Sequence, residues 1–383
     1  MPGDRAVFLR AVKLLYAFPE PLPLRRARGI QAVNSVAALA ESGVEIDFAY
    51  VPAGSENPFT YYAVPRPSQV NLMPLSRSLP WPFDRIHSNR LFAARLRRQF
   101  NLTNTLIYVR HLKLAAWLAR HSPTPRFVYE AHEVFGDTAP PGKRVERRND
   151  ESLIMRTAVA ILANSGATAR RLVELYGNPR MLEVIPNGVT PPESLPQKDW
   201  SRPGEHIVYS GSLFPWKGAA DLVAAAKDLP NCKIEIIGGE ADQIVKMKAT
   251  LSKSGAAVRF AGHLPHAMAM EQVTKACIAV LPNRADTDSG FTSPIKLFEY
   301  MAAGCAIVAS DLAPMREILD EDDVLWTIPG NPKSIAAAIN ALVDDPARAH
   351  RLGEKVRLKA SQYTWQARAA RVKALLSKIG EHP

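Results

Sequence analysis

The sequence predicts two α/β units in succession, each built around a parallel sheet covered by helices. The chain has 383 residues, too many for one ordinary core, and its 47% hydrophobic and 22% charged residues are typical of a globular protein. Short apolar runs alternate with helical patterns almost from end to end, which implies parallel strands joined by right-handed crossovers. Residues 186–206 are rich in proline and glycine and interrupt this alternation once, so we interpret them as an interdomain linker.

In the first half of the chain, apolar runs predict strands and the segments between them predict helices. The expected strands are residues 44–51, 105–110, 126–130 and 159–165, and the expected helices are residues 30–41, 111–121 and 166–177. The last of these helices ends at Gly177, because glycine commonly terminates a helix.

The alternation restarts after the linker. Strands are expected at residues 206–212, 233–239, 257–262, 277–282 and 305–311, and helices are expected to start at Lys217, Ala241, Pro265 and Pro294. Residues 364–379 have an amphipathic pattern and predict a last helix. Two such units joined by a linker leave a cleft between them.

The net charge of +11 is concentrated in the first half of the chain. Residues 1–190 contain 25 Lys and Arg against 15 Asp and Glu, whereas the remainder contains 23 against 22. A basic surface of this kind favours nucleic acid, an anionic membrane or an anionic acceptor as partner.

Residues 84–100 carry a local basic pattern of arginines among apolar residues. The arginines are Arg85, Arg90, Arg95, Arg97 and Arg98. One interpretation is an amphipathic helix at an anionic membrane, with Trp81 and Phe83 as candidate anchors. The alternative is a helix packed on the first unit with solvated arginines. The apolar face favours packing, and the charge favours a surface role.

Other features bear on location. No run approaches the ~20 apolar residues that cross a bilayer, and the N-terminus lacks the pattern of a signal peptide. Cys232, Cys277 and Cys305 are scattered and match no metal or redox spacing. We therefore expect a reducing compartment, the cytoplasm, with the inner face of the membrane as the location that the basic residues suggest.

Residues 289–311 carry the strongest sign of a binding site. Ser293 is a good N-cap, and Pro294 fits the first helical position. A helix that starts there points free backbone N–H groups at the end of a strand, an arrangement that holds phosphates. Glu299, three residues after Lys296, could then accept hydrogen bonds from ribose hydroxyls. The equally weighted alternative is a capped surface helix with a Lys–Glu pair.

Glycine turns follow other strands in the second half. Gly211 lets the backbone approach a ligand, and Lys217 supplies a point charge for a diphosphate. Gly238 and Gly239 repeat the strand–glycine pattern. Each turn alone is routine, but three in one half favour a nucleotide-binding cleft.

Taken together, the segments GSLFPWKG, IIGGE, FAGHLP, SPIKLFEYMAAGCAIVASD and LANS…VIPNGV resemble one family. They are similar, in order over residues 105–380, to the retaining, nucleotide-sugar-dependent glycosyltransferases of the GT-B fold, family 4. The resemblance implies two Rossmann-like domains facing across a cleft: residues 1–188 for the acceptor and residues 189–363 for the nucleotide sugar. It also implies that a C-terminal helix, residues 364–380, crosses back to the first domain.

The resemblance implies roles for individual residues. Lys217 would bind donor phosphate, Glu299 would contact the ribose, and His132 would face the transferred sugar as a hydrogen-bond donor or sugar contact; these are the expected catalytic residues. The expected donor-binding residues are Gly211, Ser212, Gly238, Gly239, Thr292, Ser293, Pro294, Ile295, Lys296 and Glu299. The residues expected on the acceptor side are Arg28 and Gly29, which resemble the family's first glycine loop and helix, and Glu130.

Two positions depart from the family pattern. Phe291 stands eight residues before Glu299, where the family commonly carries the first acid of E-x7-E, and Ser212 stands where it often carries arginine. A subgroup with SPxKLFEYMA also lacks the first acid, so the departure bears on donor choice rather than on activity. Asp286 or Asp288 are candidates to substitute for it.

Metal sites are not expected. The D-x-D of residues 286–288 occurs often by chance, and the family fold does not need it. His132 is flanked by Glu130 and Glu133, but no second histidine lies at ligand spacing. We expect no cofactor beyond the nucleotide sugar.

The sequence thus predicts an enzyme that transfers a sugar from a nucleotide sugar with retention, in polysaccharide, glycolipid or other glycoconjugate synthesis. An anionic or lipid-linked acceptor and peripheral membrane contact are candidates, and nucleic acid is not expected as a partner. The alternatives are an epimerase or phosphorylase on the same scaffold, or a non-catalytic binding protein. No P-loop or G-x-G-x-x-G indicates a kinase or dehydrogenase.

Overall fold

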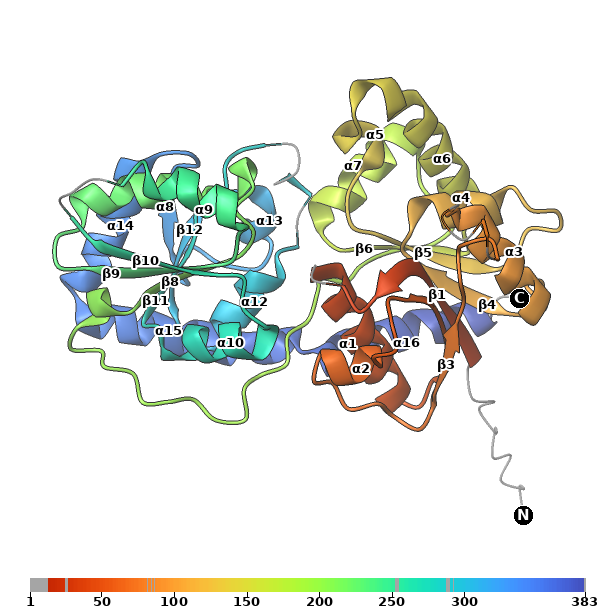
Figure 1. Cartoon of the computed structure of the whole chain (residues 1–383), viewed down its shortest axis with the longest axis horizontal. Coiled ribbons are helices and arrows are strands. Elements are labelled where there is room, and N and C mark those ends of the chain that lie inside the picture. Colours follow the sequence, from red (N-terminus) through yellow and green to blue (C-terminus); the bar gives the residue numbers. More distant parts are fainter. Residues whose placement is uncertain are drawn as a thin grey trace, which may run out of the picture.

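The structure is a computed structural model that describes residues 13–24, 27–80, 82–83, 85, 87–251, 255–286, 290–291 and 293–381. It contains two sheets, one in each half of the chain, and Figure 1 shows the two α/β units side by side. Neighbouring strands run parallel in both sheets. The predicted fold class is therefore confirmed.

The first sheet has seven strands in the order β3-β2-β1-β4-β5-β6-β7. Its strands are β1 (Lys13–Leu22), β2 (Glu45–Pro52), β3 (Val70–Pro74), β4 (Leu106–Val109), β5 (Phe127–Ala131), β6 (Ala160–Ala163) and β7 (Leu182–Val184). Its helices are α1 (Ala27–Glu41), α2 (Pro58–Tyr61), α3 (Asn89–Gln99), α4 (Leu112–Ala119), α5 (Phe135–Thr138), the 3-10 turn η1 (Pro141–Lys143), α6 (Arg144–Thr157) and α7 (Gly166–Tyr176).

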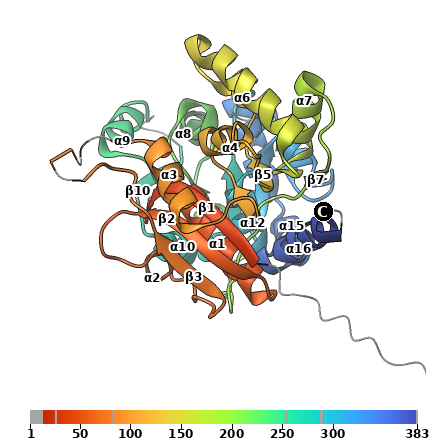
Figure 2. The same ribbon diagram turned by 90° about the vertical axis from the view of Figure 1, so that its right-hand side faces the viewer.

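The first sheet is buried on both faces, which is why its strands are continuously apolar rather than alternating. Along β1, Leu14 and Tyr16 enter one hydrophobic cluster while Leu15 and Ala17 enter the other. The first cluster lies beneath α1, and the second lies beneath α3, α4 and α6. Figure 2 shows these two sets of helices on opposite sides of the sheet.

The second sheet has six strands in the order β10-β9-β8-β11-β12-β13. Its strands are β8 (Ile207–Ser210), β9 (Lys233–Ile237), β10 (Ala257–Gly262), β11 (Ile278–Leu281), β12 (Ala306–Ser310) and β13 (Leu325–Thr327). Its α-helices are α8 (Ala219–Ala225), α9 (Ala241–Lys248), α10 (His266–Lys275), α12 (Ile295–Ala302), α13 (Ala313–Arg316), α14 (Pro332–Val343) and α15 (Pro346–Ala360). The 3-10 turns are η2 (Pro203–Glu205), η3 (Pro215–Lys217), η4 (Ala226–Asp228) and η5 (Ser361–Tyr363).

The last helix, α16 (Trp365–Glu381), returns to the first unit. Trp365, Val372 and Leu376 are buried in the same cluster as α1 and β1. This confirms the amphipathic helix predicted over residues 364–379, whose apolar stripe supplies the contact.

The connection between the sheets matches the predicted linker. In this fully described stretch, β7 ends at Val184, β8 begins at Ile207, and only the turn η2 lies between them. Val189 pairs with Thr364 in an isolated parallel bridge, so the outgoing linker and the start of α16 run together. The two crossings between the units therefore lie side by side at Val189 and Thr364, and this paired crossing is called the hinge below.

The basic segment forms helix α3, but its apolar face is not free. Phe92, Ala93 and Leu96 are buried in the second cluster of the first unit, so the interpretation of this face as a membrane surface is wrong. Arg95 donates to the carbonyls of Ser76 and Ser78, which holds a neighbouring loop. Trp81 lies outside the described residues, and Phe83 is exposed.

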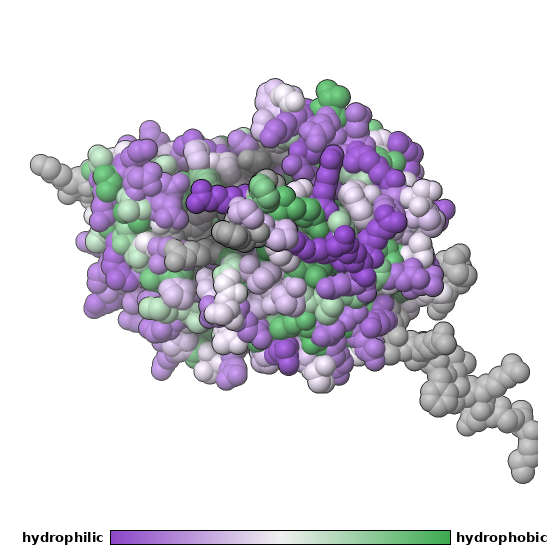
Figure 3. Space-filling model, turned by 45° about the vertical axis from the view of Figure 1, so that its right-hand side comes forward, coloured by the Kyte–Doolittle hydropathy of each residue, from purple (hydrophilic) through white to green (hydrophobic). Residues whose placement is uncertain are grey.

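Cys232, Cys277 and Cys305 are buried and form no disulfide. No helix within the described ranges combines the length and apolarity needed to cross a bilayer. On the face shown in Figure 3, hydrophobic residues form small groups among hydrophilic ones.

Candidate functional site

The helix that follows β11 starts later than predicted. Helix α12 begins at Ile295 with Pro294 at its N-cap, so the prediction of Ser293 as N-cap is wrong. The reason is that the Ser293 hydroxyl accepts the backbone N–H of Asn187 at 3.2 Å, while Asn187 Nδ2 donates to Ser293 O at 2.8 Å. Ser293 thus joins the linker to the helix start. The first hydrogen bond of the helix is donated by Leu297 N–H to Pro294 O. The N–H groups of Ile295 and Lys296 precede this bond and therefore have no acceptor within the helix.

Glu299 lies one turn into α12, buried to 3% exposure. Its Oε2 lies 2.7 Å from Lys296 Nζ, so the expected Lys–Glu pair is present. Its Oε1 lies 2.9 Å from His266 Nε2, the first residue of α10. Burial alone would raise the pKa of Glu299, but Lys296 and His266 outweigh it and lower the pKa to about 2. The site therefore holds a buried, fully ionised carboxylate.

His266 was missed by the sequence reasoning. His266 is the first residue of the helix after β10, at the same sheet edge as α12. Residues that follow the strands of a parallel sheet line the edge where ligands bind, so its sequence position alone could have indicated it.

Lys217 lies in the turn η3 rather than in the following helix, which starts at Ala219. Its Nζ sits 3.9 Å from the centre of the Trp216 ring, a cation–π contact. The backbone N–H of Arg284 donates to Trp216 O at 2.9 Å. Since Arg284 follows β11, this bond ties the Lys217 loop to the segment that leads to α12.

The glycines after β8 and β9 pack against each other. Gly238 has φ +116°, and a Cβ there would lie 2.0 Å from Gly211 O. Gly239 has φ +84°, and a Cβ there would lie 2.2 Å from Leu213 Cδ1. Only glycine fits both positions, so these turns form one close-packed edge. Ser212 is exposed there, whereas Thr292 and Asp288 lie outside the described residues.

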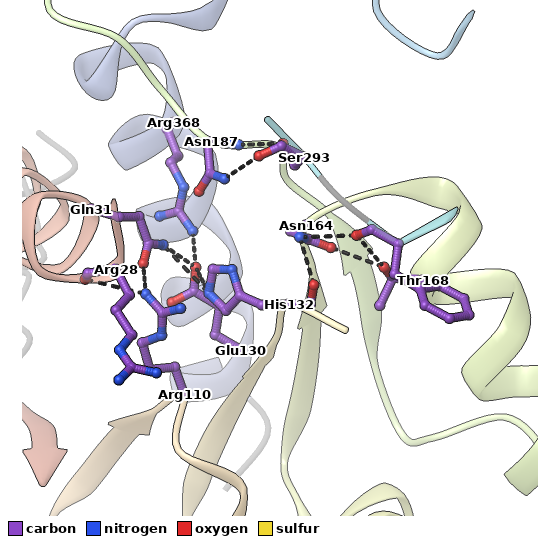
Figure 4. Close-up of polar contacts among 11 residues, drawn as sticks. Arg28, Gln31, Arg110, Glu130, His132, Asn164, Thr168, Asn187, Ser293 and Arg368 are labelled. Atoms are coloured by element: carbon purple, nitrogen blue, oxygen red, sulfur yellow. Dashed lines mark hydrogen bonds and ion pairs between the residues drawn. The ribbon is translucent and has the colours of Figure 1, made fainter. Parts of the chain in front are cut away.

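Across from this edge, a buried polar network surrounds His132, just after β5 (Figure 4). Glu130 is fully buried and pairs with Arg368 of α16 and, at 3.1 Å, with His132 Nε2. Gln31 Nε2 donates to Glu130 Oε1 at 2.8 Å, and Arg110 donates to Gln31 Oε1. Glu130 was expected on the acceptor side, but it is 0% exposed in this structure and contacts Gln31, His132 and Arg368 instead.

The charges of this network fix the state of His132. Burial would raise the pKa of Glu130, but Arg368 and His132 hold it well below its usual range. Burial and then Arg110 lower the pKa of His132 to about 4, so its ring is neutral at pH 7. With Glu130 ionised, His132 Nε2–H donates to it, which leaves Nδ1 as an acceptor. The expected role of His132 as a hydrogen-bond donor or sugar contact stays a prediction; in this tautomer Nδ1 can only accept a hydrogen bond from a ligand.

Gly29 lies inside α1 rather than in a loop. A Cβ at Gly29 would lie 2.1 Å from Tyr62 Oη, and that hydroxyl donates to Leu24 O at 2.6 Å. Glycine is thus required so that Tyr62 can hold the chain before α1. Arg28, next to it, pairs through Nε with Glu20 at 2.6 Å.

Phe291, at the position of the missing acid, bridges the two units. Its side chain packs against the second hydrophobic cluster of the first unit. Its carbonyl oxygen accepts from Asn164 Nδ2 at 3.4 Å and lies 3.3 Å from Thr168 Oγ1. Asn164 Nδ2 also donates to His132 O at 3.0 Å. The segment before α12 is therefore linked to the loop that carries His132 (Figure 4).

A second link between the units is formed by Glu317 of the second unit. It accepts the N–H of Gly166 at 2.6 Å and pairs with Arg170 at 3.1 Å, at the start of α7. A pocket of about 330 Å³ adjoins this link. Its lining comprises Asn164, Ser165, Gly166, Arg170, Val184, Pro186, Ser293, Pro314, Glu317, Ile318, Tyr363 and Arg371. The pocket lies beside the hinge, and Ser293 before α12 is part of its lining. Lys217, Glu299 and the glycines after β8 and β9 do not line it.

No group of three or more metal-ligating side chains occurs in the part of the chain that the structure describes.

Two family models match the chain in succession. Residues 29–192 match the model described as Glycosyltransferase Family 4, and residues 193–359 match the model described as Glycosyl transferases group 1.

Curated relatives match part of the chain. It is 28% identical over 244 residues to a glycogen synthase of Mycobacterium tuberculosis, covering 60% of this chain and 57% of the relative. It is 32% identical over 203 residues to a phosphatidyl-myo-inositol mannosyltransferase of the same species, covering 51% and 50%. The matched part of the chain thus spans about half the length of these relatives.

Solved structures match nearly the whole chain. A sucrose-phosphate synthase from Thermosynechococcus elongatus superposes with a TM-score of 0.77 at 18% identity, covering 98% of this chain and all of the other. HepE of Anabaena, solved in complex with UDP and glucose, superposes with a TM-score of 0.72 at 16% identity, covering 96% and 100%. These similarities show the same two-unit fold.

Proposed function

The chain belongs to the family 4 glycosyltransferases and has the GT-B fold, and we propose that it transfers a sugar from a nucleoside-diphosphate sugar to an acceptor with retention of configuration. Residues 189–363 would hold the donor. Residues 1–188, completed by the returning helix of residues 364–380, would hold the acceptor.

One observation carries this proposal: Glu299 is a buried ionised carboxylate one turn beyond a helix start whose first residues, Ile295 and Lys296, are half-buried. Ribose hydroxyls are neutral donors that such an acceptor binds, whereas a phosphate would be repelled by it. The phosphates would instead face the N–H groups of Ile295 and Lys296 and the ammonium of Lys217. HepE, which has the same fold, was solved with UDP, and this supports a nucleotide as ligand.

Catalysis would rest on stabilising the departing diphosphate. Lys217 and Lys296 supply positive charge, and the start of α12 supplies oriented N–H groups that need no reorganisation during the reaction. The leaving phosphate can accept the proton of the acceptor hydroxyl, so no protein base is required. His132 Nδ1 would accept a hydrogen bond from a hydroxyl of the transferred sugar, and Glu130 would hold the ring in that tautomer.

The acceptor would be anionic or lipid-linked. The basic first half supports this, and so does the name of a relative, a phosphatidyl-myo-inositol mannosyltransferase. Exposed Arg90, Arg97 and Arg98 on α3, together with Phe83, would provide peripheral contact with the inner face of a membrane. The reaction would need neither a metal nor nucleic acid.

A thermal-shift screen of nucleotide sugars tests the proposal. The wild type should be stabilised by at least one nucleotide sugar, and Glu299→Gln should abolish that shift. Glu271→Gln is the matched control, because Glu271 is an exposed glutamate on neighbouring α10. A full shift with Glu299→Gln would refute the proposed ribose site, and the lack of any shift with the wild type would refute the proposed donor class.

A further inference from the structure

A group of cations gathers at the edge of the first sheet beside the His132 network. Arg110 follows β4, and its Nη1 donates to Gln31 Oε1 and to Arg28 O at 3.4 Å. Arg28 lies at the start of α1, and Figure 4 shows its guanidinium next to that of Arg110. Like charges this close cost free energy unless an anion compensates them.

His111 marks the centre of this group. It is the N-cap of α4, and its Nδ1 accepts the N–H of Leu114 at 3.4 Å. Burial and then the charges of Lys113, Arg28, Arg110 and Arg77 lower the pKa of His111 to about 4. The largest charge effects on its pKa all come from cations, which belong to three segments of the first unit. The positive end of α4 adds to the same potential.

These cations are largely without acidic partners. Arg28 is paired with Glu20, but no ion pair to Arg77, Arg110 or Lys113 is formed by any residue in the described ranges. Arg77 and Arg110 are half-buried, so water screens them less than it screens surface arginines. By contrast, other half-buried arginines of this chain are paired with a carboxylate, such as Arg171 with Asp137 and Arg357 with Glu354.

We propose that Arg28, Arg77, Arg110 and Lys113 form a binding site for a phosphate group carried by the acceptor. This inference rests on the proposed function, because the acceptor must lie next to His132 for transfer to occur. Arg110 reaches His132 through Gln31 and Glu130, so the phosphate would sit beside the reacting hydroxyl. Planar guanidinium groups match phosphate oxygens in pairs, and several converging cations suit a dianion better than a single carboxylate.

The arrangement argues against nucleic acid as the occupant. Binding a nucleic-acid backbone takes a stripe of cations along a surface, spaced to follow successive phosphates. Here Arg110 and Lys113 flank His111 in the chain. The Arg77 segment lies beside it, because Ser88 N–H donates to Arg77 O and the next residue, Asn89, places Nδ2 3.4 Å from His111 Nε2. The cations thus gather at one place, which suits one phosphate group.

Inorganic phosphate is the first probe, with binding measured by isothermal titration calorimetry. Arg77→Gln/Arg110→Gln should weaken phosphate binding at least tenfold. Arg77→Gln/Lys113→Gln should weaken it as much, although this variant keeps the hydrogen bond from Arg110 to Gln31. Arg66→Gln/Arg180→Gln replaces two exposed arginines of the same unit; it is the charge-matched control and should bind phosphate as the wild type does. Because the donor site can also bind phosphate, the series is repeated in a Lys217→Gln/Lys296→Gln background, where the loss should persist. Unchanged phosphate affinity in both double variants would overturn the inference.

The source of the phosphate is distinguished in a second arm. Glycerol 1-phosphate represents a soluble acceptor, and vesicles of phosphatidylcholine with phosphatidylglycerol represent a lipid headgroup, with pure phosphatidylcholine as the blank. The probe whose binding is lost in Arg77→Gln/Arg110→Gln identifies the source, and loss for neither probe would count against the site.

The thermal shift with nucleotide sugar separates this inference from the proposed function. Loss of phosphate binding with an intact nucleotide shift supports both. Arginine-dependent phosphate binding without any nucleotide shift would leave the site standing and refute the transferase. An intact nucleotide shift together with phosphate binding that does not depend on these arginines would support the transferase and refute the phosphate site.

Discussion

Arg368 of α16 forms an ion pair with Glu130 of β5, 238 residues earlier in the chain, and both side chains are almost completely buried. Glu130 in turn accepts a hydrogen bond from His132. The helix that crosses back between the units therefore orients His132 through Glu130. This gives the returning helix a role in the site as well as in the core.

Replacing Arg368 by methionine should be strongly destabilising. It would leave Glu130 as a buried charge without its main partner, which costs about 3–5 kcal/mol of unfolding free energy. Because Glu130 also fixes the His132 tautomer, kcat should fall at least tenfold in molecules that remain folded. Urea unfolding and steady-state rates measure the two effects.

The control for this change is Lys378→Met on the same helix. Lys378 is exposed and pairs with Glu183 at 3.4 Å, so its loss should cost less than about 1 kcal/mol. Equal destabilisation by both variants would mean that the buried pair contributes nothing specific.

Glu299 predicts a particular pH dependence of stability. Its folded pKa, about 2, lies below the ordinary value of 4.5, so its ionised form stabilises the fold above pH 4.5. That contribution is lost as the pH falls from 4.5 towards 2. Glu299→Gln should therefore be less stable than the wild type at pH 7, by about 1–3 kcal/mol. The difference should shrink at pH 3.5, and a constant difference between pH 7 and pH 3.5 in chemical denaturation would contradict the assignment.

Glu317 should favour the closed arrangement of the two units. Glu317→Ala removes its bonds to Gly166 and Arg170, an interaction of about 1 kcal/mol for an exposed charge at a helix start. The radius of gyration in solution scattering should rise without nucleotide, and the donor KM should rise several-fold. Glu321→Ala, an exposed neighbour that pairs with Arg316 within the second unit, should leave both quantities unchanged.

The side chain of Phe291 should help to hold the second unit against the first unit. Phe291→Ala removes apolar contact with the first unit, about 1–2 kcal/mol for a half-buried ring. The donor KM should rise about tenfold while the melting temperature without nucleotide changes little. Phe291→Leu keeps most of the contact and should retain near-normal KM. If the alanine and leucine variants behave alike, packing at this position does not assist donor binding.

The arrangement of strands and helices could be predicted because it depends on local periodicity. Each expected strand of the second half is present within about two residues at its ends. β1 (Lys13–Leu22) was missed because the N-terminal residues were compared only with the pattern of a signal peptide. β3, VNLMP, is short and mixed in polarity, so periodicity gave no signal there.

The details of the site could be predicted only in part. The Lys296–Glu299 pair follows from helical spacing, and the glycine turns follow from strand ends. The burial of Glu130 depends on Arg368, and the altered N-cap depends on Asn187; both partners are distant in sequence. Such contacts leave no local pattern, so a single sequence does not indicate them.

The central claim is that a nucleoside diphosphate binds where β11 leads into α12, held by Lys217 and Lys296. The most direct test is calorimetric titration of UDP into the wild type, Lys217→Gln/Lys296→Gln, and a control that replaces two exposed lysines, Lys227→Gln/Lys248→Gln. The account predicts that the first double variant loses about a hundredfold or more in affinity, since each charged hydrogen bond contributes about 1.5–3 kcal/mol, while the control is unchanged. UDP binding of wild-type strength in Lys217→Gln/Lys296→Gln would contradict it.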